Sequence, residues 1–122
     1  MSDCSLKPTH QAVLYVFSVY AVAPVCRAGQ SRVYGVARGE TVHISCDLEA
    51  NPREVVFSWR FNNSMEAIDI PDKLISSEMA RSVVSYTPLT DHDYGTLLCS
   101  GVNEQGAQAE PCVFVVVPAG EY

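Results

Sequence analysis

The sequence predicts an all-β protein built as an antiparallel β-sandwich, and three observations support this prediction. From residue 26 onward, short runs rich in β-branched and aromatic residues alternate with turn signals. No window of helix length repeats its apolar residues with a period of about 3.6. Two strand-like runs carry Cys46 and Cys99, and a run between them carries Trp59.

Length and composition are those of one folded domain. The chain has 122 residues, of which 48% are apolar and 18% are charged, so a hydrophobic core is expected and disorder is not. The formal net charge is −6, and the eight Lys and Arg residues are scattered along the chain. Phosphate binding needs clustered cations, so we expect no nucleic-acid partner. We also expect no small-molecule substrate and no cofactor.

The first predicted strands follow one another closely. Val33-Tyr34-Gly35-Val36 forms a short first strand, and Gly39-Glu40 turns the chain. Residues 41–48 then alternate between apolar and polar types, which is typical of a half-buried strand. Its predicted core face carries Val42, Ile44, Cys46 and Leu48.

Residues 55–61 form the next alternating strand. Turn signals flank it at Asn51-Pro52 and at Asn62-Asn63-Ser64. Its predicted core face carries Val55, Phe57, Trp59 and Phe61.

Three more strands complete the pattern. Residues 82–89 place Val84 and Tyr86 inward, and Pro88 ends the ladder because proline has no N–H. Residues 96–102 carry Cys99, and a turn at 103–106 leads into the last strand at 107–117. The predicted core face of this last strand carries Cys112, Phe114 and Val116.

The order Cys46, Trp59, Cys99 is the cysteine–tryptophan–cysteine pattern of immunoglobulin domains. In that fold the disulfide joins the two sheets through the core and the indole packs against it. Closing so long a loop stabilises by about 4 kcal/mol in the chain-entropy model. The predicted fold class is therefore all-β, an immunoglobulin-like sandwich of the I-set or C2 kind.

The segment Asp93-Tyr94-Gly95-Thr96-Leu97-Leu98-Cys99 resembles the D-x-G-x-Y-x-C motif of the same domains. Leu97 stands where the motif has tyrosine, so the tyrosine-corner hydrogen bond is not available there and Leu97 should fill core. Asp93 keeps its motif position. We expect it to form a structural salt bridge with Arg81, the alternative being two solvated charges.

The chain has five cysteines, and none forms a CxxC pair, which disfavours zinc. Wide spacing in a strand-rich chain favours disulfides and an oxidising compartment, with buried free thiols of a cytosolic protein as the alternative. Four cysteines allow three pairings. We expect Cys46–Cys99 and Cys26–Cys112, because the first and last strands of such a sandwich can run side by side. Cys26 precedes the predicted first strand, and Cys4 lies outside the domain.

Two further features concern cellular context. Asn62-Asn63-Ser64 is an N-glycosylation sequon on Asn62, although such triplets also arise by chance. Residues 1–23 contain the apolar run 12–23, which is a signal-peptide core, a strand of a preceding domain or an artefactual gene start. The domain itself is expected at 24–120. We expect any membrane anchor of the parent protein to lie outside this chain.

Several stretches resemble an internal immunoglobulin repeat of sidestep-like proteins, which are invertebrate neuronal surface proteins with a membrane anchor. The similarity covers about residues 24–120 and is carried by Pro24-Val25-Cys26-Arg27, Gln30, Arg32-Val33-Tyr34-Gly35-Val36-Ala37-Arg38, Phe61-Asn62-Asn63-Ser64, Tyr86-Thr87-Pro88, Asp93–Cys99 and Glu110-Pro111-Cys112-Val113-Phe114. One departure is Ser100, where the family usually has tryptophan on what we predict to be an outward position. The resemblance implies cell adhesion or axon guidance through other immunoglobulin-superfamily receptors, the beaten-path group in particular.

Other function classes compete with a binding module. An internal repeat of that family can be a passive spacer, and a secreted immune-type recognition domain is a further alternative. For an enzyme, the candidates are His10, His43 and His92, and His92 lies between Asp91 and Asp93. No nucleophile or second ligand cluster accompanies them, so we expect neither catalysis nor a metal site.

Overall fold

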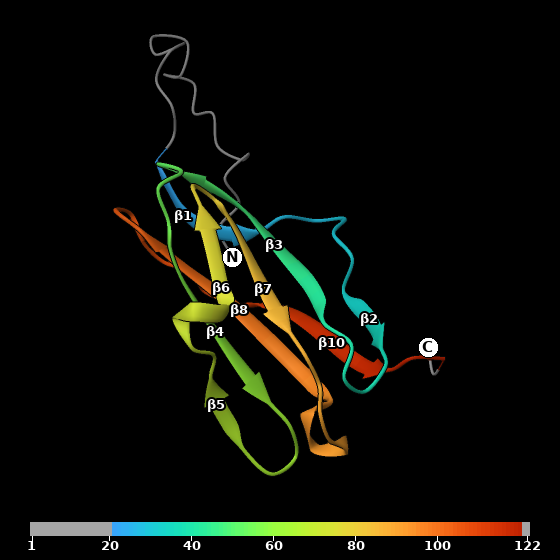
Figure 1. Ribbon diagram of the computed structural model, residues 1–122. Coiled ribbons are helices and arrows are strands. Elements are labelled where there is room, and N and C mark those ends of the chain that lie inside the picture. Colours follow the sequence, from blue (N-terminus) through green and yellow to red (C-terminus); the bar gives the residue numbers. More distant parts are fainter. Residues whose placement is uncertain (1–20, 121–122) are drawn as a thin grey trace, which may run out of the picture.

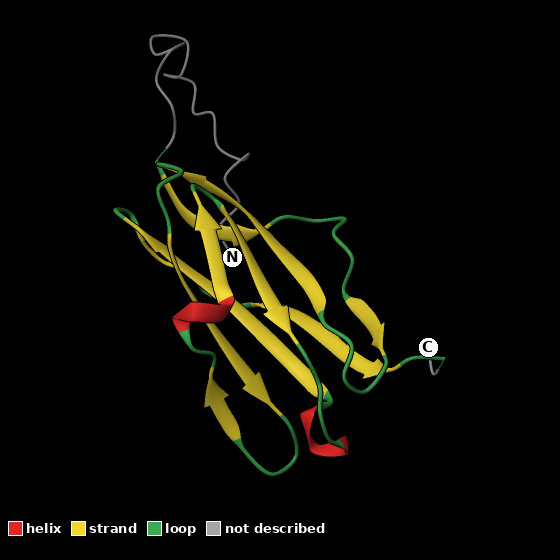
Figure 2. Ribbon diagram, viewed as in Figure 1, coloured by secondary structure: helices red, strands yellow, loops and turns green. Residues whose placement is uncertain are grey.

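Two β-sheets pack face to face in the computed structural model, which describes residues 21–120 (Figure 1). The strands are β1 (Val22–Cys26), β2 (Val33–Val36), β3 (Val42–Asn51), β4 (Val56–Asn62), β5 (Ala67–Asp69), β6 (Ile75–Glu78), β7 (Arg81–Tyr86), β8 (Gly95–Asn103), β9 (Gly106–Ala107) and β10 (Cys112–Pro118). Two short 3₁₀ turns, η2 (Asp72–Leu74) and η3 (Asp91–Asp93), are the helical elements of this part of the chain (Figure 2). Within residues 21–120, no helix has the length and apolarity to cross a membrane.

The sheets divide the strands as a β-sandwich requires. One sheet has the order β1-β3-β7-β6, and the other has the order β2-β10-β8-β4-β5 with β9 paired to β8. All pairs are antiparallel except β2 with β10, which is parallel. The predicted antiparallel sandwich is therefore confirmed.

The first strand of the domain differs from the prediction. We expected it at 33–36, with Cys26 ahead of it, but β1 contains Cys26 and pairs with β3. Pro24 weakened the strand signal there, and the pairing shifts register between Val22 and Val25. An edge strand tolerates such a proline because one side of its backbone needs no ladder partner. The predicted boundary at residue 24 remains a prediction, and residues 1–20, with Cys4, lie outside the described residues.

The last predicted strand is divided into β9 and β10. The Gln108 side chain replaces part of the ladder, because the Gly101 N–H donates to Gln108 Oε1 at 2.9 Å and the Gln108 N–H donates to the Gly101 carbonyl at 2.8 Å. Pro111, just before β10, has no N–H to offer. Alternation alone does not reveal this interruption, since the apolar pattern continues across it.

The core lies between the two sheets and is apolar. Its buried members include Ile44, Cys46, Leu48, Trp59, Phe61, Val84, Leu97, Cys99, Phe114 and Val116. Leu97 is fully buried, and the Trp59 and Phe114 rings lie 5.8 Å apart. Phe57 is half-buried and packs against this core from its side.

One buried polar chain crosses between the sheets. The Trp59 Nε1–H of β4 donates to Ser82 Oγ of β7 at 2.8 Å, and Ser77 Oγ lies 2.7 Å from Ser82 Oγ. Ser82 is fully buried. The indole N–H is therefore satisfied inside an apolar core, which fixes the orientation of the tryptophan.

Two disulfides hold the sandwich together, with the pairing that we predicted. Cys46–Cys99 joins β3 to β8 across the core, with Cα atoms 6.6 Å apart. Cys26–Cys112 joins β1 to β10 at the edge, with Cα atoms 5.5 Å apart. Each therefore connects one sheet to the other.

Candidate protein-interaction face

The outer face of the six-stranded sheet gathers apolar side chains on neighbouring strands. Trp59, Cys99 and Cys112 lie opposite one another and point into the core, so the residues that alternate with them point outward. We call this outward surface the valine-rich face. Its members are Val33, Val56, Ser58, Arg60, Leu98, Ser100, Val102, Val113 and Val115.

The apolar members of this face form contiguous rows. Val56 lies opposite Val102. Val56 is 75% exposed and Val102 is 47% exposed. Farther along the strands, Val113 lies opposite Leu98 and is 40% exposed. Single exposed apolar residues are ordinary, whereas neighbouring ones on adjacent strands make this face a candidate interaction surface.

A shallow hollow lies in the middle of the valine-rich face. It has a volume of about 260 Å³ and is lined by Ser58, Trp59, Arg60, Asp69, Leu98, Ser100 and Pro111. The small side chains Ser58 and Ser100, opposite one another on β4 and β8, leave this space. Arg60 and Asp69 form an ion pair of 3.2 Å beside it. The outward position that we predicted for Ser100 is the one that the structure shows.

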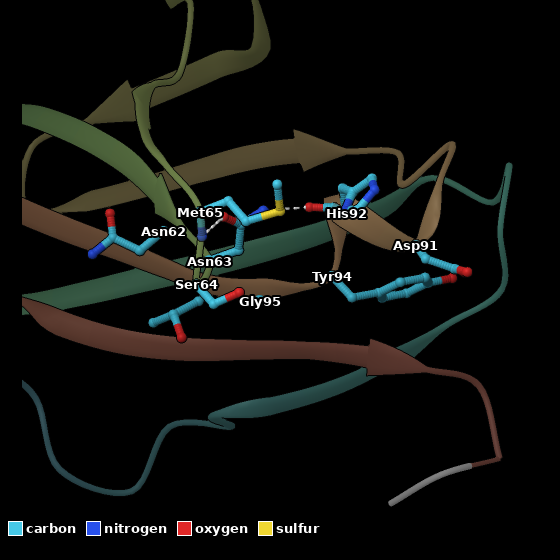
Figure 3. Close-up of a pocket in the computed structure, with 9 residues that line it drawn as sticks. Asn62, Asn63, Ser64, Met65, Asp91, His92, Tyr94 and Gly95 are labelled. Atoms are coloured by element: carbon cyan, nitrogen blue, oxygen red, sulfur yellow. Dashed lines mark hydrogen bonds between the residues drawn. The ribbon is translucent and has the colours of Figure 1, made fainter.

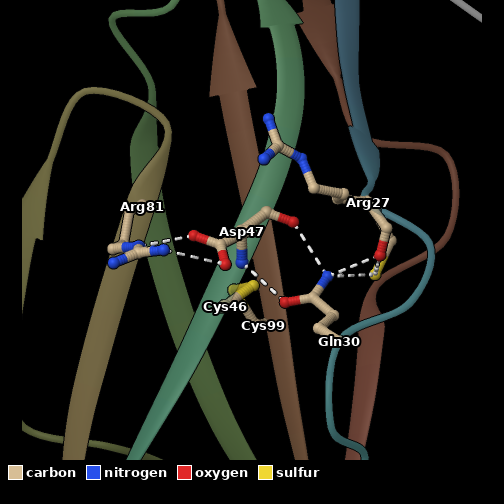
Figure 4. A network of polar contacts seen from close by, with 7 residues as sticks. Arg27, Gln30, Cys46, Asp47, Arg81 and Cys99 are labelled. Carbon is tan, nitrogen blue, oxygen red and sulfur yellow. Dashed lines mark hydrogen bonds and ion pairs between the residues drawn. A yellow bond between two sulfur atoms is a disulfide. The ribbon is translucent and has the colours of Figure 1, made fainter.

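The outer face of the four-stranded sheet has the opposite character. Its side chains are mainly polar and pair across the strands, as between Arg81 and Asp47, and between His43 and Ser85 at 3.1 Å. Gln30, between β1 and β2, donates from Nε2 to the Asp47 carbonyl at 2.9 Å and accepts from the Asp47 N–H at 2.8 Å (Figure 4). The side-chain amide of Gln30 thus pairs with the backbone of β3 as a neighbouring strand would. It does so in the connection between β1 and β2, where the chain passes from one sheet to the other.

The salt bridge predicted between Asp93 and Arg81 is wrong. Arg81 instead binds Asp47, from Nε to Oδ1 at 2.6 Å and from Nη2 to Oδ2 at 3.2 Å (Figure 4). The reason is register, because Asp47 and Arg81 lie opposite one another on β3 and β7. This hydrogen bond and the Asp47 charge raise the pKa of Arg81 above its ordinary value.

Asp93 has a local role in its turn. Its Oδ2 accepts the N–H groups of Leu89 at 2.8 Å and Thr90 at 3.1 Å. The Thr90 side chain in turn accepts the His92 N–H, which completes a capping box around η3. The carboxylate that we assigned to a salt bridge therefore shapes the connection between β7 and β8.

Two tyrosine hydroxyls, whose hydrogen bonds the sequence pattern does not predict, take the place of the missing tyrosine corner. Tyr86 Oη–H donates to the Asp93 carbonyl at 2.6 Å, and Tyr94 Oη–H donates to the Val36 carbonyl at 2.8 Å. The Tyr86 ring also stacks on Phe61 at 5.8 Å. Burial first, and the Asp93 charge second, raise the pKa of Tyr86 well above its ordinary value.

The sequon loop lies at one end of the valine-rich face. Asn62 is half-buried at the end of β4, where it borders a hollow of about 420 Å³ with Ser64 and Met65 (Figure 3). Asn63 holds the loop, because its Nδ2 donates to the His92 carbonyl at 2.7 Å and its Oδ1 accepts the Met65 N–H at 2.7 Å. Glycosylation of Asn62 stays a prediction.

Comparison with known proteins agrees with this architecture. No family model matches the chain. The I-band fragment I67–I69 of titin is similar, with 22% identity and a TM-score of 0.62 over 80% of this chain and 33% of that one. A structure that explains Dscam isoform specificity has 16% identity and a TM-score of 0.60 over 81% of this chain and 25% of that one. The complex of titin M10 with an obscurin-like 1 immunoglobulin domain has 18% identity and a TM-score of 0.58, over 79% and 93%.

These similarities establish the fold. The protein has the immunoglobulin fold, as its cysteine–tryptophan–cysteine pattern predicted. The chain spans about a third of the titin fragment and a quarter of the Dscam chain.

Proposed function

We propose that the protein is an extracellular immunoglobulin-like domain of a cell-adhesion or axon-guidance type protein. Its role is to mediate contacts with other immunoglobulin-superfamily proteins through the valine-rich face. The observation that carries this proposal is the apolar outer surface of β4, β8 and β10, which the fold itself does not need. The similarity to sidestep-like proteins supports the adhesion and guidance role.

An extracellular location is supported by the disulfides. Both pairs join the two sheets, and such structural disulfides form and persist in oxidising compartments. The sequon at Asn62 fits the same compartment. We propose that the parent is a single-pass membrane glycoprotein.

The proposed partners are other immunoglobulin domains. One of the similar structures is a complex of titin M10 with an immunoglobulin domain of obscurin-like 1. For this chain the beaten-path group is the first set of candidates, because the resemblance of residues 24–120 points to it. We propose no catalytic activity.

A display experiment tests the proposal. The chain is secreted as a multivalent fusion and screened against purified beaten-path-like ectodomains and other immunoglobulin-superfamily ectodomains. We expect at least one to bind, Val113→Arg to abolish that binding, and Ser85→Arg on the polar face to preserve it. Both substitutions place the same charge at an outward strand position.

The outcomes separate the proposal from its alternatives. Binding to no ectodomain in the panel would favour the passive spacer. Equal loss of binding in Val113→Arg and Ser85→Arg would remove the valine-rich face from the proposal. Free thiols at Cys26, Cys46, Cys99 or Cys112 in the secreted product, located by peptide mapping after alkylation, would remove the disulfide argument for location.

A further inference from the structure

The two disulfides of the domain differ in how far they are shielded from solvent. Cys46 and Cys99 are both fully buried in the core between the sheets. In the other pair Cys112 is fully buried as well, but Cys26 is only half-buried and lies on the edge strand β1. Access is one of the factors that set the rate at which a disulfide exchanges with a dissolved thiol. The edge disulfide is therefore the more accessible of the two.

A hollow opens beside the accessible cysteine. It has a volume of about 610 Å³ and lies between β1, the Arg32 side chain and the segment 107–111. Cys26 lines this hollow, whereas Cys112 does not. A small thiol that enters the hollow therefore meets the sulfur atom of Cys26 rather than that of its partner.

Nitrogen donors point at the Cys26 sulfur. Arg32 donates from Nη2 to Cys26 Sγ at 3.2 Å, and Gln30 donates from Nε2 to the same atom at 3.4 Å. The guanidinium of Arg32 lies over the Phe114 ring, 5.8 Å from its centroid, and takes no part in the ion pairs of residues 21–120. A cation beside a cysteine favours the thiolate, which is the reactive form. The carboxylate of Glu110 lines the same hollow, but the guanidinium is the charged group that contacts the sulfur.

The buried sulfur of the pair also has a donor beside it. Gln108 Nε2 lies 3.7 Å from Cys112 Sγ and donates to it. Negative charge that develops on Cys112 when the disulfide opens is therefore met by an N–H group inside the protein.

We propose that Cys26–Cys112 is a site of thiol–disulfide exchange, which a low-molecular-weight thiol opens at Cys26 with the help of Arg32 while Cys46–Cys99 stays closed. The thiolate of the reagent forms a bond to Cys26 Sγ, and the bond from Cys26 Sγ to Cys112 Sγ breaks. The electron pair of that bond leaves with Cys112, which then takes a proton from water.

A second molecule of the thiol completes the exchange. Its thiolate attacks the reagent sulfur of the mixed disulfide, which releases the oxidised reagent and leaves Cys26 as a thiolate beside Arg32. Two thiols of the reagent are thus oxidised to one disulfide, and one disulfide of the protein is reduced to two thiols.

Opening this disulfide affects the edge of the sandwich and spares its centre. Cys26–Cys112 is the covalent link between β1 and β10, and the pairing of β1 with β3 shifts register along its length. Cys46–Cys99 continues to join β3 to β8 through the core. The exchange therefore loosens the first strand of the domain in response to the thiol concentration, which is a property beyond the proposed binding function.

Selective opening is the first test. The full chain carries Cys4→Ser, which removes the fifth cysteine as a competing thiol, and is treated with reduced glutathione without denaturant. N-Ethylmaleimide stops the reaction, and peptide mapping locates each modification. We expect Cys26–Cys112 to open at least tenfold faster than Cys46–Cys99, with glutathione on Cys26 and maleimide on Cys112. Equal rates for the two disulfides, glutathione on Cys112, or no opening while the protein stays folded would each overturn the inference.

Variants of Arg32 test its part in the exchange. Arg32→Met removes the charge and keeps an apolar chain over the Phe114 ring, and we expect it to slow the opening at least fivefold. Arg32→Lys keeps the charge and should restore most of the rate. The matched control is Arg53→Met, which removes the same charge from an exposed position that does not line the hollow and should open like wild type.

The direction of the change excludes damage to the fold as its cause. A loosened domain exposes its disulfides and opens faster, so a slower rate in Arg32→Met reports the lost cation. Opening of Arg32→Met at the rate of wild type, or equal slowing in Arg53→Met, would overturn the role of Arg32.

Discussion

The two outer faces of the sandwich share one core and present different chemistry to the solvent. On the four-stranded sheet, polar and charged side chains pair across strands, as Arg81 does with Asp47. On the six-stranded sheet, the outward positions carry Val56, Val102 and Val113, which remain exposed. The inner faces of both sheets pack against the same core, so burial of the inner faces does not account for the difference.

This comparison separates stability from recognition. Exposed apolar side chains that contact little within the chain add little to folding, because burial is what stabilises them. Polar side chains that hold backbone groups do contribute, because an unsatisfied backbone group is destabilising. We therefore expect substitutions on the valine-rich face to change binding, and substitutions of the polar side chains that bind backbone groups of β3 and of the β7–β8 turn to change stability.

The largest effect should follow from making the apolar face polar without changing its shape. Replacing Val56, Val102 and Val113 by Thr should weaken partner binding by about 100-fold, equivalent to about 2.7 kcal/mol. Unfolding in urea should change by less than about 0.5 kcal/mol, as is usual for surface positions. Titration of the bound ectodomain and chemical unfolding measure the two quantities. A large loss of stability would show that these valines serve the fold.

On the opposite sheet the expectation is reversed. Gln30→Ala leaves the N–H and the carbonyl of Asp47 without their partner and should destabilise by about 1–3 kcal/mol. Partner binding by the folded protein should be unchanged. Gln105→Ala, in the exposed turn after β8, is the control and should unfold like wild type. If Gln30→Ala and Gln105→Ala unfold at the same denaturant midpoint, the hydrogen bonds of Gln30 to the Asp47 backbone do not stabilise the fold.

A smaller effect tests how β7 holds the turn before β8. Tyr86→Phe removes the hydrogen bond to the Asp93 carbonyl and should cost about 1 kcal/mol. The pKa of Tyr86 is raised in the folded state, so the unfolded state loses its proton first as pH rises. The contribution of Tyr86 to the free energy of unfolding is therefore fully present at pH values below 10.0, its ordinary pKa. That contribution is lost as the pH rises above this value. Unfolding at a series of alkaline pH values should show a shallower decline for Tyr86→Phe, and an unchanged slope would refute this assignment.

The smallest effect is expected at the ion pair itself. Arg81 is exposed and its pair with Asp47 is screened by solvent, so Arg81→Ala should leave the unfolding midpoint within experimental error. Thermal unfolding at low and high salt checks this. A clear, salt-dependent shift would mean that the polar face stabilises through charge rather than through backbone hydrogen bonds.

Much of the fold followed from local patterns. The alternation in residues 41–48 and 55–61 placed Ile44, Cys46 and Trp59 inward, where the structure has them.

The strands with a weak sequence signal were missed for identifiable reasons. Pro24 concealed β1, and the Gln108 side chain interrupts a strand whose apolar pattern continues. The short strands β5 and β6 carry few apolar residues and depend on their neighbours.

The candidate site was less predictable than the core. Sequence alone indicated an outward Ser100, but not that Ser58 lies opposite it and leaves a hollow. The partner of Arg81 was also assigned wrongly, because Asp47 and Asp93 are equally plausible until the register of β3 and β7 is known. Side-chain pairs across strands depend on register, which alternation does not supply.

The sequence by itself determined the sandwich, the core faces of its main strands and the Cys46–Cys99 pair, and the strand arrangement of that fold then indicated Cys26–Cys112. These depend on alternation and on the spacing of Cys46, Trp59 and Cys99, which a single chain displays. The tertiary structure decided which outward residues become neighbours. It placed Val56 beside Val102 and Val113 beside Leu98. Such a surface arises only when strands far apart in the chain lie side by side, because its members share no local pattern.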